Sequence, residues 1–288
     1  MAAQRIAENL AFINWTLLAD LAVGAFGAVV LMRLWTGATR GFLVLSALCA
    51  AGFGLLAHLS DGALVEAANQ PGSTVTIDPT WTPWRDGALI LFTILALAYA
   101  IAIARGHRAP ILGLAGLGAG IAALAFGALS WGGSRGIPGP FGTAFGVAVA
   151  FGQDLLLAAA TGGVFVAMIL GHWYLVTPKL PEAPLILLSR ILFALVVAQI
   201  VLFGLSMLLG AGSGEGPFSP LSGPWAQFVW LRLLVGLIFP LVVSWAAIQT
   251  ARSRSMESAT GLLYINVGSI AAGTILAAGL YFGAGLIA

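Results

Sequence analysis

The stretch from Leu10 to Leu34 decides the fold, and it reads LAFINWTLLADLAVGAFGAVVLMRL. Its only charged side chains are Asp20 near the middle and Arg33 near the end. A helix of about 20 mostly apolar residues is long enough to cross the hydrocarbon core of a bilayer. The stretch therefore predicts a transmembrane helix, and it is too long for the apolar core of a signal peptide.

The rest of the chain has the same character. Of its 288 residues, 60% are hydrophobic and 8% are charged, whereas soluble domains have about 45–50% apolar and about 25% charged residues. Such a chain cannot cover itself with a polar surface, so we expect an integral membrane protein in contact with the lipid bilayer. Because it has no run of lysine or arginine, nucleic acid is not expected as a partner.

Further segments have the length and composition of a membrane span. The predicted fold is an all-α bundle of about eight transmembrane helices, in a single membrane domain over residues 1–288. A polar loop is expected over residues 61–86. The predicted spans are residues 10–34, 41–60, 87–104, 110–131, 153–176, 184–209, 225–250 and 259–286.

The stretch 137–152 allows two interpretations, because it begins with Ile137-Pro138-Gly139-Pro140 and contains three further glycines. It can extend the fifth span into a helix of about 35 residues and about 52 Å, which is longer than a bilayer requires. It can instead form a re-entrant segment, which must be buried in protein because lipid cannot satisfy an irregular backbone. Its length favours the re-entrant segment.

Four plus four spans suggest an internal repeat with halves 1–136 and 137–288. Laying residues 24–35 on residues 162–173 matches Gly24 with Gly162 and Trp35 with Trp173. With an even number of spans in each half, the repeat would be parallel. Little else matches beyond shared apolarity, so a true repeat and a chance similarity both stay open.

The basic residues gather at one predicted face of the membrane, with few at the other. By the positive-inside rule, the richer face is cytoplasmic, which places both termini outside. The expected location is a bacterial inner membrane, crossed many times. The inner face carries Arg33, Arg40, Arg105, Arg108, Lys179, Arg190, Arg252 and Arg254, and the outer face carries Arg5, Arg85 and Arg135.

Three charged side chains interrupt or open predicted spans, namely Asp20, Asp154 and Arg232. Charge within a bilayer is costly, so each is a candidate functional residue on a substrate or ion pathway. Asp154 and Arg232 are predicted at the same outer level, where an ion pair would offset the cost of burying both. The alternative for Arg232 is an anion, carboxylate or quinone-headgroup site. Asp20 can relay protons, coordinate a cation, or remain neutral and hydrogen-bonded.

A proline interrupts the seventh span. Pro240 has no N–H to donate to the carbonyl four residues earlier, so it is expected to bend the helix and free the carbonyl near Gly236. Asn266 and Ser269 of the last span are candidate polar neighbours of this bend.

The sharpest candidate for a cofactor is His172, in the sequence Gly171-His172-Trp173-Tyr174 near the inner end of the fifth span. An imidazole is a good ligand of haem iron. Together with Trp173 and Tyr174, it can also line a quinone pocket. The alternative is an interfacial cluster, because tryptophan and tyrosine prefer the membrane interface.

Two further histidines are candidate cofactor ligands. His107 lies in a turn on the same predicted inner side as His172, so the two can share one haem, or His107 is simply solvated. His58 lies near the outer end of the second span, and Ala50 and Gly54 on its helix face leave room for a flat cofactor or a neighbouring helix. His58 and His172 are expected roughly 20 Å or more apart, which excludes a shared haem.

Three functions are compatible with these residues. The leading hypothesis is a membrane subunit of an electron-transfer complex, which handles quinone or haem b together with other membrane subunits. The second is a small-solute or ion transporter that uses Asp20, Asp154 and Arg232. The third is a structural or assembly subunit. Because no hydrolase or nucleotide-binding motif is present, we expect no catalysis by the chain alone, and an enzymatic role only within an oxidoreductase complex.

Overall fold

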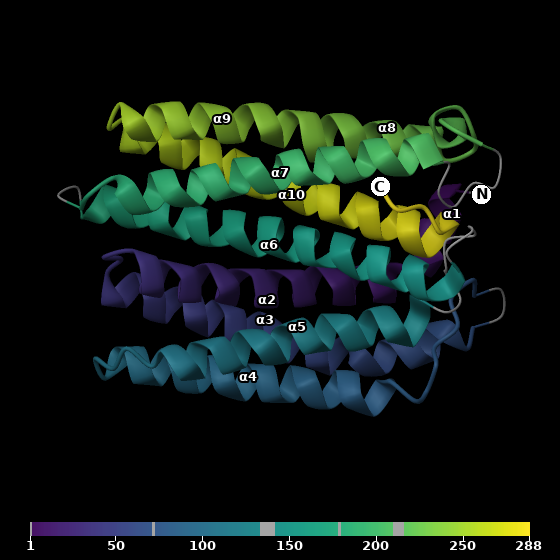
Figure 1. Cartoon of the computed structure of the whole chain (residues 1–288), viewed down its shortest axis with the longest axis horizontal. Coiled ribbons are helices and arrows are strands. Elements are labelled where there is room, and N and C mark those ends of the chain that lie inside the picture. Colours follow the sequence, from purple (N-terminus) through teal and green to yellow (C-terminus); the bar gives the residue numbers. More distant parts are fainter. Residues whose placement is uncertain (1, 71–72, 133–141, 178–179, 210–215) are drawn as a thin grey trace.

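The computed structural model describes residues 2–70, 73–132, 142–177, 180–209 and 216–288. Long helices run side by side in one bundle (Figure 1), and eight helical segments are long and apolar enough to cross a membrane. The described ranges contain no β-strand. The predicted all-α bundle of membrane-spanning helices is therefore confirmed.

The first half of the chain forms the short α1 (Ala2–Glu8) and four spans, which are α2 (Leu10–Trp35), α3 (Arg40–Ala68), α4 (Thr82–Ala104) and α5 (Pro110–Gly132). The second half begins with α6 (Gly142–Val176) and α7 (Ala183–Leu209), and it ends with α10 (Met256–Ala284). Between α7 and α10 lie the 3-10 turn η1 (Ser219–Leu221) and the seventh span. This span consists of α8 (Ala226–Leu233), the π-helical turn η2 (Leu234–Ile238) and α9 (Phe239–Arg252).

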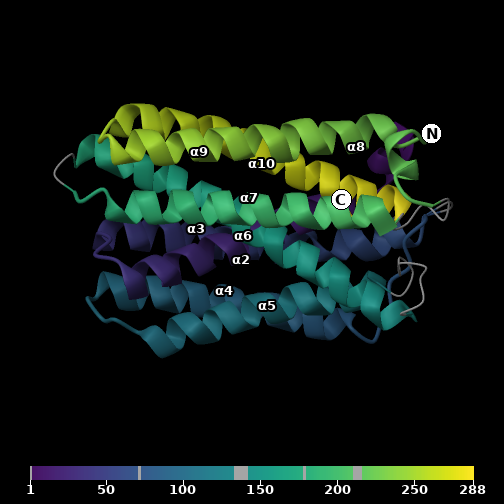
Figure 2. The ribbon, with the colours of Figure 1, turned by 45° about the horizontal axis from the view of Figure 1, so that its top comes forward.

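In Figure 1, α2 and α6 occupy the middle of the bundle, with α3, α4 and α5 on one side and α7, α9 and α10 on the other. Figure 2 again shows α4 and α5 on the side opposite α9 and α10. The helices α2 and α6 run in the same direction and cross at Gly24 and Gly162. A Cβ atom added to Gly162 would lie 2.0 Å from the main-chain nitrogen of Ala25, and one added to Gly24 would lie 1.7 Å from the main-chain oxygen of Ala158. Only glycine permits such a close backbone approach between membrane helices.

The re-entrant interpretation of residues 137–152 is wrong for the part that the structure describes. Residues 142–152 are the first turns of α6, a single helix of 35 residues, and residues 137–141 lie outside the described residues. The glycines of this stretch keep their N–H groups, so the helical hydrogen bonds continue. A helical glycine costs about 1 kcal/mol relative to alanine, whereas an unsatisfied backbone group in lipid costs several.

The loop expected over residues 61–86 is shorter in the structure. The helix α3 continues to Ala68 and α4 begins at Thr82, so Asp61 and Arg85 lie within helices and not in the loop. The loop folds over this end of the bundle, where Val75 is fully buried and the Asp78 N–H donates to the main-chain oxygen of Ser130 at 2.7 Å.

Both termini lie at the same end of the bundle (Figure 1). The opposite end of the bundle carries basic residues at the ends of α2, α3 and α9, namely Arg33, Arg40 and Arg252. The grouping of basic residues away from the termini is thus a property of the fold. The assignment of this basic end to the cytoplasm stays a prediction.

Candidate functional site

The side chain of Asp20, near the middle of α2, is completely buried. Neither of its carboxylate oxygens has a hydrogen-bond partner among the described residues. Asp154, on the neighbouring helix α6, places a second carboxylate near that of Asp20. Buried polar groups are nearly always hydrogen-bonded in folded proteins. A buried carboxylate without a hydrogen-bond partner and near a second carboxylate is therefore unusual, and it marks this part of the bundle as a candidate site.

A cavity of about 30 Å³ lies beside Asp154, where α2, α5, α6 and α10 meet. The lining residues whose side chains carry polar oxygen atoms are Thr16, Gln153, Asp154 and Tyr281. Gln153 donates its Nε2 to the main-chain oxygen of Ala288 at 3.1 Å, and its buried Oε1 has no partner within the described ranges. Thr16 precedes Asp20 by one turn of α2, so the cavity and the buried carboxylate share one side of this helix.

The ion pair expected between Arg232 and Asp154 is wrong, since no described carboxylate side chain lies within ion-pair distance of Arg232. The guanidinium, which is only 1% exposed, donates instead to Gln199 Oε1 at 2.7 Å and to the main-chain oxygens of Gly236 at 3.2 Å and Ala288 at 3.3 Å. The same oxygen of Ala288 also accepts a hydrogen bond from Gln153, which lines the cavity. Arg232 is therefore connected to the cavity wall through Ala288 and does not line the cavity itself.

The predicted effect of Pro240 explains one of these bonds. The proline ring cannot donate to the oxygen of Gly236, and the Arg232 guanidinium takes this oxygen as its acceptor. The preceding turn is π-helical, a local irregularity that is frequent at functional sites. Ser269 of α10 donates its hydroxyl to the main-chain oxygen of Val235 in the same turn at 2.5 Å. Ser269 is thus a polar neighbour of the bend, as predicted.

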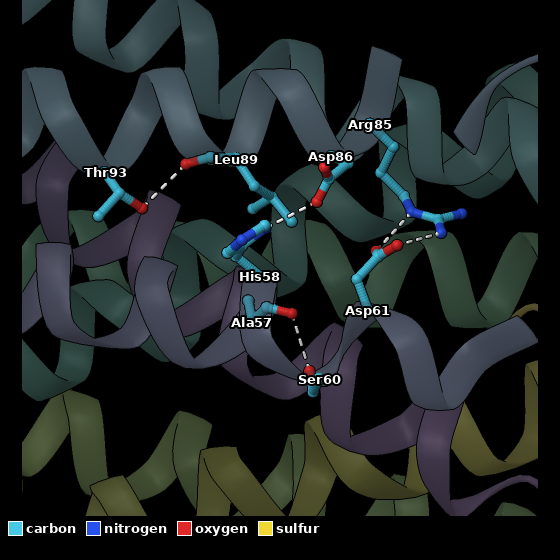
Figure 3. A network of polar contacts seen from close by, with 8 residues as sticks. All are labelled: Ala57, His58, Ser60, Asp61, Arg85, Asp86, Leu89 and Thr93. Atoms are coloured by element: carbon cyan, nitrogen blue, oxygen red, sulfur yellow. Dashed lines mark hydrogen bonds and ion pairs between the residues drawn. The ribbon is translucent and has the colours of Figure 1, made fainter. Parts of the chain in front are cut away.

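A second buried arginine was missed by the sequence analysis, which placed Arg85 in the outer loop. Arg85 is 0% exposed and donates through Nε and Nη2 to both oxygens of Asp61, each at 2.8 Å (Figure 3). Its guanidinium also lies over the rings of Trp15 and Trp131, with 5.7 and 5.4 Å to their centroids. This cation–π contact places Arg85 behind Trp131, an aromatic wall of the cavity.

The two polar pairs in Figure 3 share a sequence signal that could have revealed them. His58 and Asp61 lie three residues apart on α3, and Arg85 and Asp86 are adjacent on α4. Nδ1 of His58 lies 2.6 Å from Oδ1 of Asp86, beside the Asp61–Arg85 pair. Complementary charged residues near the facing ends of two consecutive spans indicate that the two helices continue past the apolar stretch.

The small residues beside His58 are used for helix packing. A Cβ atom on Gly54 would lie 2.8 Å from atoms of Phe92 and Thr93 on α4. The sequence allowed either a flat cofactor or a neighbouring helix beside His58. The structure places the helix α4 there.

The neighbourhood of His172 is likewise built from helix contacts. The exposed imidazole has Nδ1 3.4 Å from the Tyr264 hydroxyl. A Cβ atom on Gly171 would lie 2.9 Å from the hydroxyl oxygen of Thr260 on α10. Tyr174 is buried and donates its hydroxyl to the main-chain oxygen of Pro181 at 2.5 Å. Its hydroxyl therefore holds the turn that follows α6.

Trp173 and His107 complete the set of residues considered for a cofactor. The ring of Trp173 packs against Gly41, where an added Cβ atom would lie 2.8 Å from it. His107 is exposed in the turn between α4 and α5, and its main-chain oxygen accepts from Arg33 Nη2 at 3.4 Å. In the described part of the chain, no three side chains of histidine, cysteine, aspartate or glutamate gather as a metal site. The three histidines thus occupy three separate environments.

Comparison with known proteins adds no family to this picture, because no protein-family model and no curated protein matches the chain. The function is therefore inferred from the site itself, of which the buried Asp20 and the partly buried Asp154 are the chemically most unusual part.

Proposed function

We propose that the protein is a membrane transporter for a small solute or ion, in which Asp20 and Asp154 bind a proton or small cation during transport. One observation carries this proposal. The Asp20 carboxylate is fully buried within a membrane span, without a hydrogen-bond donor among the described residues, and a second carboxylate, that of Asp154, lies on the neighbouring helix α6.

The energetics of buried charge support an exchangeable ion at this place. An ionised carboxylate in an apolar interior is costly unless it is paired. Two carboxylates side by side therefore favour uptake of a proton or cation, and movement of the helices towards water favours its release. Ionisable residues within spans typically mark ion pathways and proton relays.

Charge movement tests the proposal without knowledge of the transported solute. Purified protein in liposomes, adsorbed on a solid-supported membrane, is exposed to rapid jumps in pH and in Na⁺ concentration. We expect transient currents from the wild type in at least one of the two jumps, because ion binding within the membrane displaces charge. Replacing both carboxylates (Asp20→Asn with Asp154→Asn) should reduce these currents at least tenfold.

The matched control is Asp86→Asn, which removes a partly exposed carboxylate of α4 that pairs with His58 away from the cavity. This variant should keep the wild-type currents. Equal currents from the wild type and the Asp20/Asp154 double variant, or none from a folded wild type, would contradict the proposal.

A second candidate function is the handling of haem or quinone by an electron-transfer subunit. The contact between His172 and Tyr264 favours it, because a hydrogen-bonded imidazole at a membrane surface can bind a cofactor. An apolar cavity of about 210 Å³ between α2, α5, α6 and α7 could take an isoprenoid tail. An absorption spectrum after expression with ample haem tests the haem version. A Soret band that disappears in His172→Ala supports it, and a colourless protein argues against it.

A further inference from the structure

We propose that the cavity beside Asp154 binds a dehydrated alkali cation of the size of Na⁺, and that this cation is the coupling ion. This inference rests on the transport function proposed above, and it names the ion that the carboxylates exchange.

The polar wall of the cavity presents oxygen atoms. Thr16 and Tyr281 contribute hydroxyls, Asp154 a carboxylate and Gln153 an amide. Because the amide nitrogen of Gln153 donates to a main-chain oxygen, the amide oxygen is left as the group without a partner in the described structure. Gln153 is 6% exposed, so this oxygen can satisfy its bonding only inside the protein. Oxygen ligands suit hard cations.

The charges around the cavity favour a cation over an anion. Asp154 lies in its wall, and Asp20 lies one turn deeper on α2. The two nearby arginines are already engaged, Arg85 by Asp61 behind the Trp131 ring and Arg232 by Gln199 Oε1 and the oxygens of Gly236 and Ala288. Among the described residues that line the cavity, none is basic. A bound cation would therefore lower the cost of holding two carboxylates together.

The volume of the cavity and the small number of oxygen atoms in its wall together select among cations. Its volume of about 30 Å³ admits roughly one body the size of a water molecule. Ca²⁺ requires about six to eight oxygen ligands, and Mg²⁺ usually keeps several waters; the few oxygen-bearing side chains of this wall do not supply the first, and the cavity does not hold the second. A dehydrated K⁺ is about the size of a water molecule and fits the volume, but K⁺ filters surround it with many carbonyl oxygens, whereas few oxygen-bearing side chains line this cavity. The aromatic walls of Trp131 and Phe282 on α5 and α10 further restrict the space.

Direct binding of ²²Na⁺ to the purified full-length protein tests the inference. In detergent, we expect one saturable Na⁺ site per chain, from which excess K⁺ displaces the label at least tenfold less effectively than Na⁺. Gln153→Leu and Asp154→Asn should each weaken binding at least tenfold. Thr16→Val, which keeps the side-chain shape, should weaken it several-fold. Gln249→Leu is the matched control on an exposed surface of α9, and its binding should equal that of the wild type.

Three results would overturn the inference. These are a folded wild type without saturable Na⁺ binding, a preference for K⁺, or unchanged Na⁺ binding in folded Gln153→Leu and Thr16→Val. Currents from pH jumps that depend on Asp20 and Asp154, without a response to Na⁺, would leave the transporter proposal standing with the proton as coupling ion. Absence of both currents and binding would reject both proposals.

Discussion

At the scale of single residues, the bundle handles its buried charges in two different ways. Arg85 forms a bidentate ion pair with Asp61, with both N–O distances at 2.8 Å, and its guanidinium lies over the aromatic rings of Trp15 and Trp131. Asp20 has no such partner among the described residues. A charge that is paired with its counter-ion serves the fold, whereas an unpaired one is costly and requires an explanation. This contrast is the reason for placing the function at Asp20 and Asp154.

The Asp61–Arg85 pair gives a stability prediction. Asp61→Ala leaves the Arg85 guanidinium buried without its carboxylate, and breaking a buried pair in this way costs about 3–5 kcal/mol. We expect a large drop in the free energy of unfolding, measured by denaturation in mixed micelles. The double variant Asp61→Leu with Arg85→Met should recover most of the loss, because it removes both charges.

The neighbouring pair is the control for this measurement. His58 and Asp86 are 30% and 39% exposed, so Asp86→Asn should change the free energy of unfolding by no more than about 1 kcal/mol. Equal effects of Asp61→Ala and Asp86→Asn would show that burial does not distinguish the two pairs.

At the scale of helices, the close crossing of α2 and α6 places Asp20 beside Asp154. The crossing depends on glycine, since the backbone atoms of one helix occupy the space where a side chain of the other would begin. The seventh span, in contrast, is irregular at its centre. There, η2 and Pro240 leave main-chain oxygens that Arg232 and Ser269 satisfy.

Two adjacent glycines of α6 give a matched test of the crossing. In Gly162→Ala, the new methyl group would lie 2.0 Å from the main-chain nitrogen of Ala25, so the helices must separate and stability should fall by several kcal/mol. In Gly163→Ala, the methyl group meets nothing within 4 Å, and the better helix propensity should leave stability equal or raise it by up to about 1 kcal/mol. Thermal unfolding of the two purified variants measures the difference, and equal midpoints would contradict the packing argument.

At the scale of the whole molecule, the glycine crossing bears on the repeat prediction. The two glycines that the predicted repeat matches are in direct contact between the first spans of the two halves. Asp61 and Gln199 are separated along the chain by the same distance as these glycines. Each of them accepts from a buried arginine of the following span. Common descent of the two halves stays a prediction, which these coincidences support.

The orientation of the bundle gives the last prediction. In a Cys49→Ala background, single cysteines replace Ser222 and Ser253, which are exposed at opposite ends of the seventh span. If the basic end faces the cytoplasm, a membrane-impermeant maleimide should label Ser222→Cys in cells with a permeabilised outer membrane. Ser253→Cys should react only after the inner membrane is opened. The reverse pattern would invert the predicted topology.

The sequence by itself determined the membrane class and the eight spans, because about 20 consecutive apolar residues have few other stable environments. It also identified Asp20, Asp154 and Arg232 as residues that need an explanation, and it anticipated the free oxygen of Gly236. It did not anticipate that α6 extends to Gly142, or that α3 and α4 continue far enough to pair Asp61 with Arg85.

Only the tertiary structure decided which of these groups meet. Arg232 bonds to Gln199 rather than Asp154, and the space beside Gly54 and Gly171 is filled by α4 and α10. The physical reason is that apolar spans fix their own helical structure locally, whereas their rotation and depth depend on side-chain packing between helices distant in sequence. The side-by-side position of Asp20 and Asp154, on which the proposed function depends, is a product of that packing.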